Sequence, residues 1–209
     1  NETSKNLSAV GYSALYNQKS WDYSSALGAF AGRYDTSGND SADFFDTTCI
    51  GYNSRASGHY QVVLGDTEAY TYTRGGAIHD LSDARDKTDV RDTIMGLDFI
   101  KSLRPVDYRW DYREDYLQFN PKTGEHNPIP KDGSKKRTRF HHGLIAQEVK
   151  TAADEMGVDF AGFQDHTING GDERMTLGYS EFIAPLIKAV QELSEENAAL
   201  KARLDAAGL

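Results

Sequence analysis

The sequence contains one cysteine, five prolines and no long apolar run. The single cysteine and the lack of a long apolar run each argue against a class of protein. Cys49 has no second cysteine to pair with, so we predict neither a disulfide framework nor a thiolate metal site. No apolar stretch approaches the roughly 20 residues of a membrane-spanning helix, so we expect no membrane insertion. Lys and Arg (23) are outnumbered by Asp and Glu (32), for a net charge of −9. Because phosphate binding needs concentrated basic residues, we expect no nucleic-acid partner.

Tyrosine, by contrast, is abundant. Twelve Tyr residues contribute to an aromatic content of 11%, whereas the hydrophobic content is only 38%. A chain of 209 residues should form one or two small domains, and this apolar content is low for a self-sufficient globule. The combination favours an elongated or oligomeric protein whose core forms partly between chains. The chain opens on Asn1 rather than Met, so we expect it to be the C-terminal part of a longer protein.

Two polar clusters suggest ligand binding. The basic run at residues 135–139 is either a solvated loop tip or a contact for an anion or a nucleotide. His141 and His142 suggest a metal site, but adjacent residues of a strand point to opposite faces, and no further ligands cluster beside them. We therefore predict no metal and no cofactor.

The first 81 residues indicate β-rich repeats. Three segments join two apolar residues to a glycine, namely Ala9–Tyr12, Cys49–Tyr52 and Val63–Asp66. The last two begin 14 residues apart, which is typical of stacked β-turn units that bury their faces only against neighbours. Their sequences resemble the head repeats of trimeric β-roll adhesins and the repeats near the ends of phage tail fibres. Trp21–Asp46 fits the period poorly, and we interpret it as a surface insertion.

Residues 67–80 alternate Thr and Tyr before the pair Gly75 and Gly76. The alternation predicts a strand. The glycine pair predicts either a mobile backbone that can be presented to a catalytic group or an ordinary hairpin turn.

The middle of the chain predicts mixed α/β structure. Apolar residues recur at helical spacing over residues 88–103, and Pro105 then ends the helix. Residues 106–110 are typical of a strand, and residues 120–139 of a polar, proline-bearing loop. A further helix is expected over residues 145–156.

The C-terminal tail carries a heptad repeat over about residues 180–207. Its a and d positions hold Ile183, Leu186, Val190, Leu193, Asn197, Leu200, Leu204 and Ala207. Glu196 at g and Lys201 at the following e have the spacing of an interchain ion pair, which favours a coiled coil. The same stripe could instead pack on its own domain, as the apolar face of an ordinary amphipathic helix does. Asn197 at position a fixes the register at some cost in stability, and the pattern leaves open two strands or three.

Five segments, in this order, carry a family resemblance: Ser82–Lys87, Gly96–Ile100, Leu103–Trp110, His142–Val149 and Gly178–Glu181. They are similar to the C-terminal intramolecular chaperone autoprocessing domain of phage tail spikes and tail fibres, the S74 peptidase family. The resemblance spans residues 82–209. Membrane-bound transcription factors of animals carry a related domain, and the repeats before residue 82 favour the phage context.

The resemblance implies an α+β fold and a homotrimer. Residues 1–81 would be the distal end of a trimeric β-rich fibre, of β-roll or β-helix type, and residues 82–209 a mixed α/β chaperone ending in the coiled-coil helix. The chaperone's partners would be its own copies and the upstream fibre of the same chain, and the fibre would bind a bacterial surface receptor. The fibre would belong to the virion tail after assembly in the host cytoplasm, and the chaperone fragment would be released.

A physical reason supports this arrangement. Interwound chains make mostly non-local contacts, so their nucleation is slow and prone to register errors. A C-terminal coiled coil raises the local concentration of the chain ends to roughly millimolar.

By the same resemblance, Ser82 is the nucleophile and Lys87 the general base for cleavage of the Leu81–Ser82 bond. A lysine with an ordinary pKa of about 10.4 is protonated at neutral pH, so it acts as a base only when it is desolvated or crowded by cations. Trimer assembly could supply the desolvation and so delay cleavage until folding is complete.

Supporting roles are expected of four further residues. Asp83 and Arg85 could position Lys87, or they could simply be a helix N-terminal carboxylate and an exposed arginine. His142 would pack or form hydrogen bonds near the cleavage site. Gln147 would lie where a helix begins and contribute polar or interchain contacts.

Two alternatives remain open. A non-catalytic trimeric adhesin or tail-fibre tip would keep the repeats and a coiled-coil clamp, with Ser82 and Lys87 as surface residues. A glycan hydrolase would need paired carboxylates in a cleft. The spacing selects no pair among the candidates Asp35, Asp40, Asp43 and Asp46.

Overall fold

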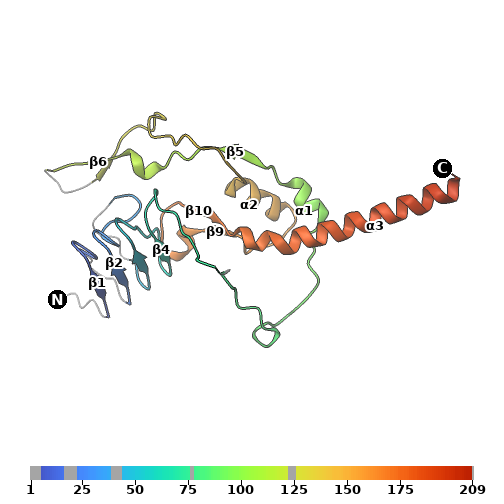
Figure 1. Cartoon of the computed structure of the whole chain (residues 1–209), viewed down its shortest axis with the longest axis horizontal. Coiled ribbons are helices and arrows are strands. Elements are labelled where there is room, and N and C mark those ends of the chain that lie inside the picture. Colours follow the sequence, from blue (N-terminus) through green and yellow to red (C-terminus); the bar gives the residue numbers. More distant parts are fainter. Residues whose placement is uncertain (1–5, 17–22, 39–43, 76–77, 122–125, 209) are drawn as a thin grey trace. The chain divides into compact units, whose positions relative to one another are not determined.

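A computed structural model describes residues 6–16, 23–38, 44–75, 78–121 and 126–208. The fold is of the α+β class, with short strands and a long C-terminal helix (Figure 1). The chain divides into two compact units. Unit 1 comprises Asn1–Gly75, Tyr108–His141 and Asp165–Arg174, and unit 2 comprises Gly76–Asp107, His142–Gln164 and Met175–Leu209. Unit 1 therefore includes two segments from beyond residue 82.

Unit 1 begins with four short parallel strands paired in sequence order (Figure 1). They are β1 (Ser8–Val10), β2 (Ser25–Leu27), β3 (Thr48–Ile50) and β4 (Val62–Leu64). The middle residues of the strands form one row, in which Ala26 and Cys49 are buried. Burial raises the pKa of the Cys49 thiol to about 11, so this side chain is a neutral part of the core. The outer residues of each strand point away from that core, as pleating requires.

A glycine follows each of the four strands, and close packing explains why. Gly11, Gly28 and Gly51 have φ values of 137°, 134° and 109°, which L side chains rarely adopt. A Cβ on Gly28 would lie 2.7 Å from the carbonyl of Gly51, and one on Gly51 would lie 3.1 Å from Gly65. The predicted stacking of units that each end in glycine is therefore confirmed within this chain.

The interpretation of Trp21–Asp46 as an insertion is wrong in part. Strand β2 lies within this stretch and pairs with both β1 and β3. Its sequence repeats the pattern of β1, Ser-Ala-aliphatic-Gly, but the four strands begin at residues 8, 25, 48 and 62. Because the connections differ in length, a fixed period does not reveal the repeat. Trp21 and residues 39–43 lie outside the described residues.

The strand predicted within residues 67–80 is also wrong for the part that the structure describes. Residues 65–75 contain no strand, and Tyr70 and Tyr72 are exposed. Alternating residues form a strand only where a neighbouring strand satisfies the backbone. None of the pairings among described strands involves this segment. Gly76 lies outside the described residues.

Unit 1 is completed by short elements from the middle of the chain. They are the 3-10 helices η2 (Arg113–Tyr116) and η3 (His166–Asn169) and the strands β6 (Leu117–Phe119) and β7 (His126–Pro128). β6 and β7 pair antiparallel, so the segment predicted as a loop at residues 120–139 contains a strand.

Among the described residues, the α-helices and two further 3-10 helices lie in unit 2. They are η1 (Ala84–Asp86), α1 (Leu97–Ser102), α2 (Ala146–Glu155), η4 (Tyr179–Phe182) and α3 (Ile183–Ala207). Two small sheets pair β5 (Val106–Tyr108) with β8 (His141–Gly143) and β9 (Phe163–Asp165) with β10 (Met175–Leu177). The predictions of a strand from residue 106 and a helix from residue 145 are confirmed.

The helix predicted from residue 88 begins only at Leu97. Asp89 has a φ of 52°, which no α-helix accommodates. Val90 and Ile94, expected on the buried face of that helix, are 80% and 69% exposed. Both are β-branched and Gly96 follows, which lowers the helix propensity of the segment.

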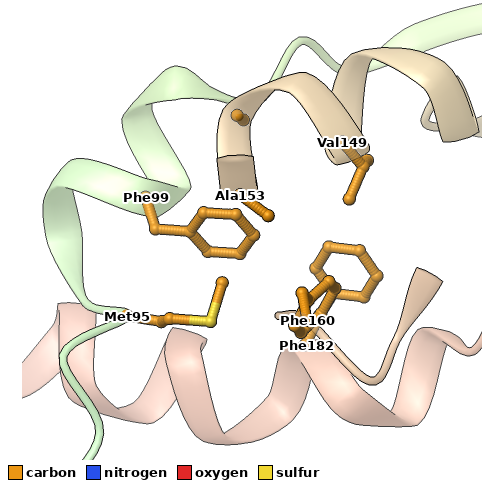
Figure 2. Packing of buried hydrophobic residues seen from close by; sticks show 7 residues of the cluster. Met95, Phe99, Val149, Ala153, Phe160 and Phe182 are labelled. Atoms are coloured by element: carbon orange, nitrogen blue, oxygen red, sulfur yellow. The ribbon is translucent and has the colours of Figure 1, made fainter. Parts of the chain in front are cut away.

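Figure 2 shows the core of unit 2, where aromatic rings from separate segments meet. Phe99 of α1 packs with its ring centroid 5.4 Å from that of Phe160 and 6.4 Å from that of Phe182. Met95 and Val149 extend the buried cluster. Burying one such side chain contributes about 1.5–3 kcal/mol, so this cluster holds α1 and α2 against the start of α3.

Helix α3 uses two different faces. The face towards α1 carries Pro185, Ala189 and Glu192, spaced by three or four residues, of which the first two are buried. The aliphatic a and d residues from Ile183 to Leu204 remain 42–65% exposed. In the single chain, therefore, the heptad stripe does not pack on its own domain. No helix among the described residues is both long and apolar enough to cross a membrane.

Candidate functional site

The candidate site is a tight turn in unit 2 between residues 82 and 87. The Nζ atom of Lys87 donates a hydrogen bond to Oγ of Ser82, and the two atoms are 2.7 Å apart. Proton transfer to a catalytic base requires a separation of about 2.6–3.2 Å. The structure thus brings together the two residues to which the family resemblance assigns the chemistry.

The short helix η1 produces this turn. The carboxylate of Asp83 accepts a hydrogen bond from the backbone N–H of Arg85 at 2.9 Å, which caps the start of the helix. The backbone N–H of Lys87 then donates to the carbonyl of Ala84 at 3.3 Å. Aspartate is a favoured cap because its short side chain reaches otherwise unpaired N–H groups. One 3-10 turn is enough to return the side chain of Lys87 to Ser82.

Asp83 and Arg85 also form an ion pair, with 2.6 Å between Arg85 Nη2 and Asp83 Oδ2. Hydrogen bonds from Arg85 hold the pKa of the Asp83 carboxyl below its ordinary value, and Asp83 raises the pKa of Arg85. Both groups are therefore charged at neutral pH. The structure thus contains a capping carboxylate beside an exposed arginine.

The whole segment around the site is exposed. No described residue between Gly58 and Met95 is buried, and Leu81 is 82% exposed. Apolar side chains at Ile78, Val90 and Ile94 also face water. In the single chain, this segment lacks the burial that a catalytic lysine needs.

His142 and Gln147 do not join this turn, since no described contact links either of them to Ser82 or Lys87. Nδ1 of His142 donates to Asp107 Oδ1 at 2.6 Å and so connects β8 with β5. Gln147 lies in the first turn of α2, as predicted, with an exposed side chain. Among the described residues, no three His, Cys, Asp or Glu side chains converge as a metal site would require.

Within unit 1, residues from beyond position 82 contact the β-repeats. Nδ1 of His166 lies 2.6 Å from Ser57 Oγ and 3.0 Å from Gln61 Nε2. The backbone N–H of Asp172 donates to the carbonyl of Ser57 at 2.8 Å, and its carboxylate accepts a hydrogen bond from Thr36. Polar groups of residues 165–174 therefore bond to groups in the connections before β3 and β4.

Residues 108–141 make contacts of the same kind. His126 Nδ1 donates to the carbonyl of Gly38 at 2.8 Å. Arg137, from the basic run, pairs with Asp115 at 3.1 Å and with Glu68. This arginine therefore has an intramolecular structural role.

One further residue of unit 2 gave no functional signal in the sequence. Glu192 occupies heptad position c of α3, where a surface glutamate is ordinary. Its Oε2 atom accepts a hydrogen bond from the backbone N–H of Leu97 at 2.7 Å, at the start of α1.

Comparison with known proteins finds a family model that matches part of the chain. Residues 82–158 match the family model Peptidase S74, described as chaperone of endosialidase. The match starts at Ser82 and includes the first four of the five motifs, whereas Gly178–Glu181 and α3 lie beyond it. A comparison with curated proteins gives no match.

Proposed function

Because the chain contains a chaperone-of-endosialidase domain at residues 82–158, we propose that residues 82–209 assemble a trimeric tail fibre and then release themselves. Residues 1–81 are the end of that fibre in this proposal, and release occurs by self-cleavage at the Leu81–Ser82 bond. The 2.7 Å contact between Lys87 Nζ and Ser82 Oγ carries the proposal of self-cleavage. The fibre remains in the virion tail, where it binds a bacterial surface receptor, and the chaperone fragment leaves.

The contacts inside unit 1 support the chaperone role. His166, Asp172 and His126, all beyond the proposed cleavage point, bond to groups of the β-repeats. These groups lie in the connections between the repeat strands, where polar groups left without partners are costly when they are buried. Partners supplied by the same chain allow the last repeats to form before further copies arrive.

Two exposed apolar faces support self-association. One is the heptad stripe of α3. The other, which we call the aliphatic column, consists of the third residue of each repeat strand: Val10, Leu27, Ile50 and Leu64. These four side chains are 39–65% exposed. Apolar rows of this kind mark interaction surfaces, and we assign both to contacts among three copies of the chain.

The first step of the proposed chemistry is an acyl shift within Ser82. Lys87, as a neutral amine, takes the proton of Ser82 Oγ, and the oxygen attacks the carbonyl carbon of Leu81 through a five-membered ring. The carbon–nitrogen bond breaks, and the amine of Ser82 receives the proton from Lys87. The acyl group of Leu81 is then held as an ester on Ser82 Oγ.

Water completes the reaction. A water molecule adds to the ester carbonyl, and the carbon–oxygen bond to Ser82 breaks. Leu81 leaves as a carboxylate and Ser82 regains its hydroxyl at a new N-terminus. One peptide bond and one water are consumed, and no cofactor is needed.

Assembly controls the timing in this proposal. Burial favours the neutral form of a lysine, and packing of the exposed segment against other copies would remove water from Lys87. Cleavage after assembly then separates the fibre from its coiled coil. The persistence of the fibre is thereafter set by its barrier to unfolding.

Gel electrophoresis of four variants tests the proposal. The wild-type chain should give two fragments that split near residue 81, whereas Ser82→Ala and Lys87→Ala should stay whole. Lys101→Ala and Ser194→Ala replace exposed residues of the same types elsewhere in unit 2 and should cleave normally. If the wild-type chain stays whole while it assembles, the non-catalytic adhesin is the better description.

A further inference from the structure

The exposed segment that carries Ser82 and Lys87 has its first buried anchor at Met95 and Gly96. Met95 packs in the core of unit 2 (Figure 2), and α1 starts at Leu97. About 10 residues separate Lys87 from Leu97, and they can span up to about 35 Å. The position of this anchor therefore limits the space that the serine–lysine pair can reach.

Glu192 of α3 holds the anchor from outside its own segment. Its Oε2 atom accepts the backbone N–H of Leu97 at 2.7 Å, and its Oε1 atom lies 3.5 Å from Nζ of Lys188. Both carboxylate oxygens are thus engaged, one by the anchor and one by the preceding turn of α3. An N–H group at the start of a helix has no partner within the helix, so an outside acceptor satisfies it.

Gly96 provides the space for this contact. A Cβ at this position would lie 2.7 Å from the carboxyl carbon of Glu192, closer than packed atoms approach. Gly96 has φ −119° and ψ −135°, outside the α and β regions that L side chains favour. An alanine would therefore displace the carboxylate of Glu192 from Leu97 and also strain the backbone at this position.

The same helix carries the exposed heptad stripe. Val190 at position a and Leu193 at position d flank Glu192 in sequence and are 65% and 42% exposed. Glu192, at position c, faces α1. Packing of further copies on the stripe would therefore leave the contact between Glu192 and Leu97 in place. The cleavage segment, which is anchored at the start of α1, would then stay attached to the assembled helices.

We infer that Glu192 is a positioning residue for self-cleavage, because it ties the start of α1, and with it the segment bearing Ser82 and Lys87, to the assembly helix. The inference rests on the proposed self-cleavage. In this inference, Glu192, which lies outside the matched family segment, couples assembly to cleavage.

The test uses the full chain and compares cleavage half-time on gels with molar mass from light scattering and with melting temperature. Glu192→Ala should assemble to the wild-type mass, melt close to wild type and cleave about tenfold more slowly, because it loses one charge-assisted bond. Gly96→Ala should also assemble and should cleave at least as slowly, because it loses the same bond and strains the backbone. Glu192→Gln should restore cleavage, since its amide oxygen can accept the same N–H. Glu195→Ala, on the exposed side of α3, is the matched control and should cleave normally.

The double variant separates a specific contact from general damage. With Glu192→Ala in place, an alanine at Gly96 no longer meets the carboxylate. The pair should therefore slow cleavage by less than the two separate effects combined. Additive slowing would contradict the inference, as would wild-type cleavage by Glu192→Ala or slow cleavage by Glu192→Gln. Slowing that only follows a fall in melting temperature would assign Glu192 a purely structural role and also overturn it.

Failure of the proposed function looks different. In that case the wild-type chain stays whole, or Ser82→Ala cleaves as the wild type does, whatever the residue at position 192. That result would contradict the proposed self-cleavage, and with it the positioning role of Glu192.

Discussion

At the scale of single residues, the proposed chemistry depends on a local turn. Ser82 and Lys87 meet beside one turn of 3-10 helix capped by Asp83, and both side chains are exposed among the residues that the structure describes. The geometry for proton transfer is therefore present before assembly, whereas the burial that would make the lysine a base is not. In this account, assembly supplies the missing environment.

Substitution of Asp83 tests the importance of the turn. Asp83→Ala removes the acceptor for the N–H of Arg85 and the partner of its guanidinium, so Lys87 should visit Ser82 less often and cleavage should slow several-fold. Asp83→Asn keeps an oxygen acceptor and should lie closer to wild type. Cleavage half-times measure both effects, with Asp86→Ala as the neighbouring acidic control. If Asp83→Ala cleaves at the wild-type rate, the cap does not form the site.

The sequence predicts these residues unevenly. Ser82 and Lys87 can be identified because their segment is followed by four further family motifs in the expected order. A serine five residues before a lysine would mean little alone. Glu192 could not be found, because a glutamate at an outer heptad position is ordinary and its partner is a backbone N–H 95 residues away. Sequence patterns record side chains and say nothing of which backbone groups they meet.

At the scale of elements, α3 is a helix with separate inner and outer faces. A charge in the outer stripe should prevent self-association while leaving the fold of unit 2 intact. We expect Leu193→Asp to lower the molar mass from trimer to monomer in light scattering, because a carboxylate would be buried without a partner. Glu195→Gln is the control on the same helix. A trimer formed by Leu193→Asp would show that the stripe is not the interface.

The aliphatic column of the repeats allows an equivalent test. Ile50→Asp places a charge at the third position of β3, on the face opposite the buried Cys49. We expect this variant to keep the coiled-coil trimer but to lose the resistance of the fibre segment to protease digestion. Ser8→Asp, at an exposed polar position of β1, should leave that resistance unchanged. Equal digestion of the two variants would exclude the column from the interface.

The elements that could be predicted are those defined by their own sequence. The repeat glycines, α2 and α3 follow from local patterns of apolar residues and turn residues. The helix expected from residue 88 failed because Asp89 and Gly96 interrupt a periodic pattern, and β2 was missed because unequal connections hide the repeat. In the first case the backbone conformation interrupts a helical pattern, and in the second the unequal connection lengths obscure the repeat.

At the scale of the whole molecule, contacts within unit 1 join segments from both sides of the proposed cleavage point. His166 is central to them, and burial lowers its pKa; Asp172 and Asp165 raise the pKa, whereas Arg174 lowers it. Because an amide nitrogen only donates, Nδ1 of His166 accepts the hydrogen bond from Gln61 Nε2. This bond requires that Nδ1 carry no proton, so the imidazole ring is neutral.

The pH dependence of stability should follow. The folded pKa of His166 lies below its unfolded value of about 6.5, so its contribution to the free energy of unfolding is complete above that pH and is lost as the pH falls towards the folded pKa. Burial also lowers the pKa of His59, which acts in the same direction. Melting temperatures of Ser82→Ala should therefore fall between pH 7.5 and pH 5, and His166→Gln should weaken that dependence. An unchanged profile in His166→Gln would contradict this assignment.

The central claim is that the chain cuts itself at one bond once it has assembled. Intact-mass spectrometry of the purified wild-type chain, recorded over time after refolding, tests it most directly. We predict that two masses appear as the trimer forms, corresponding to residues 1–81 and 82–209 with Ser82 as the new N-terminus, and that Ser82→Ala keeps the undivided mass. A wild-type trimer with a single undivided mass, or fragments that also appear in Ser82→Ala, would contradict the account.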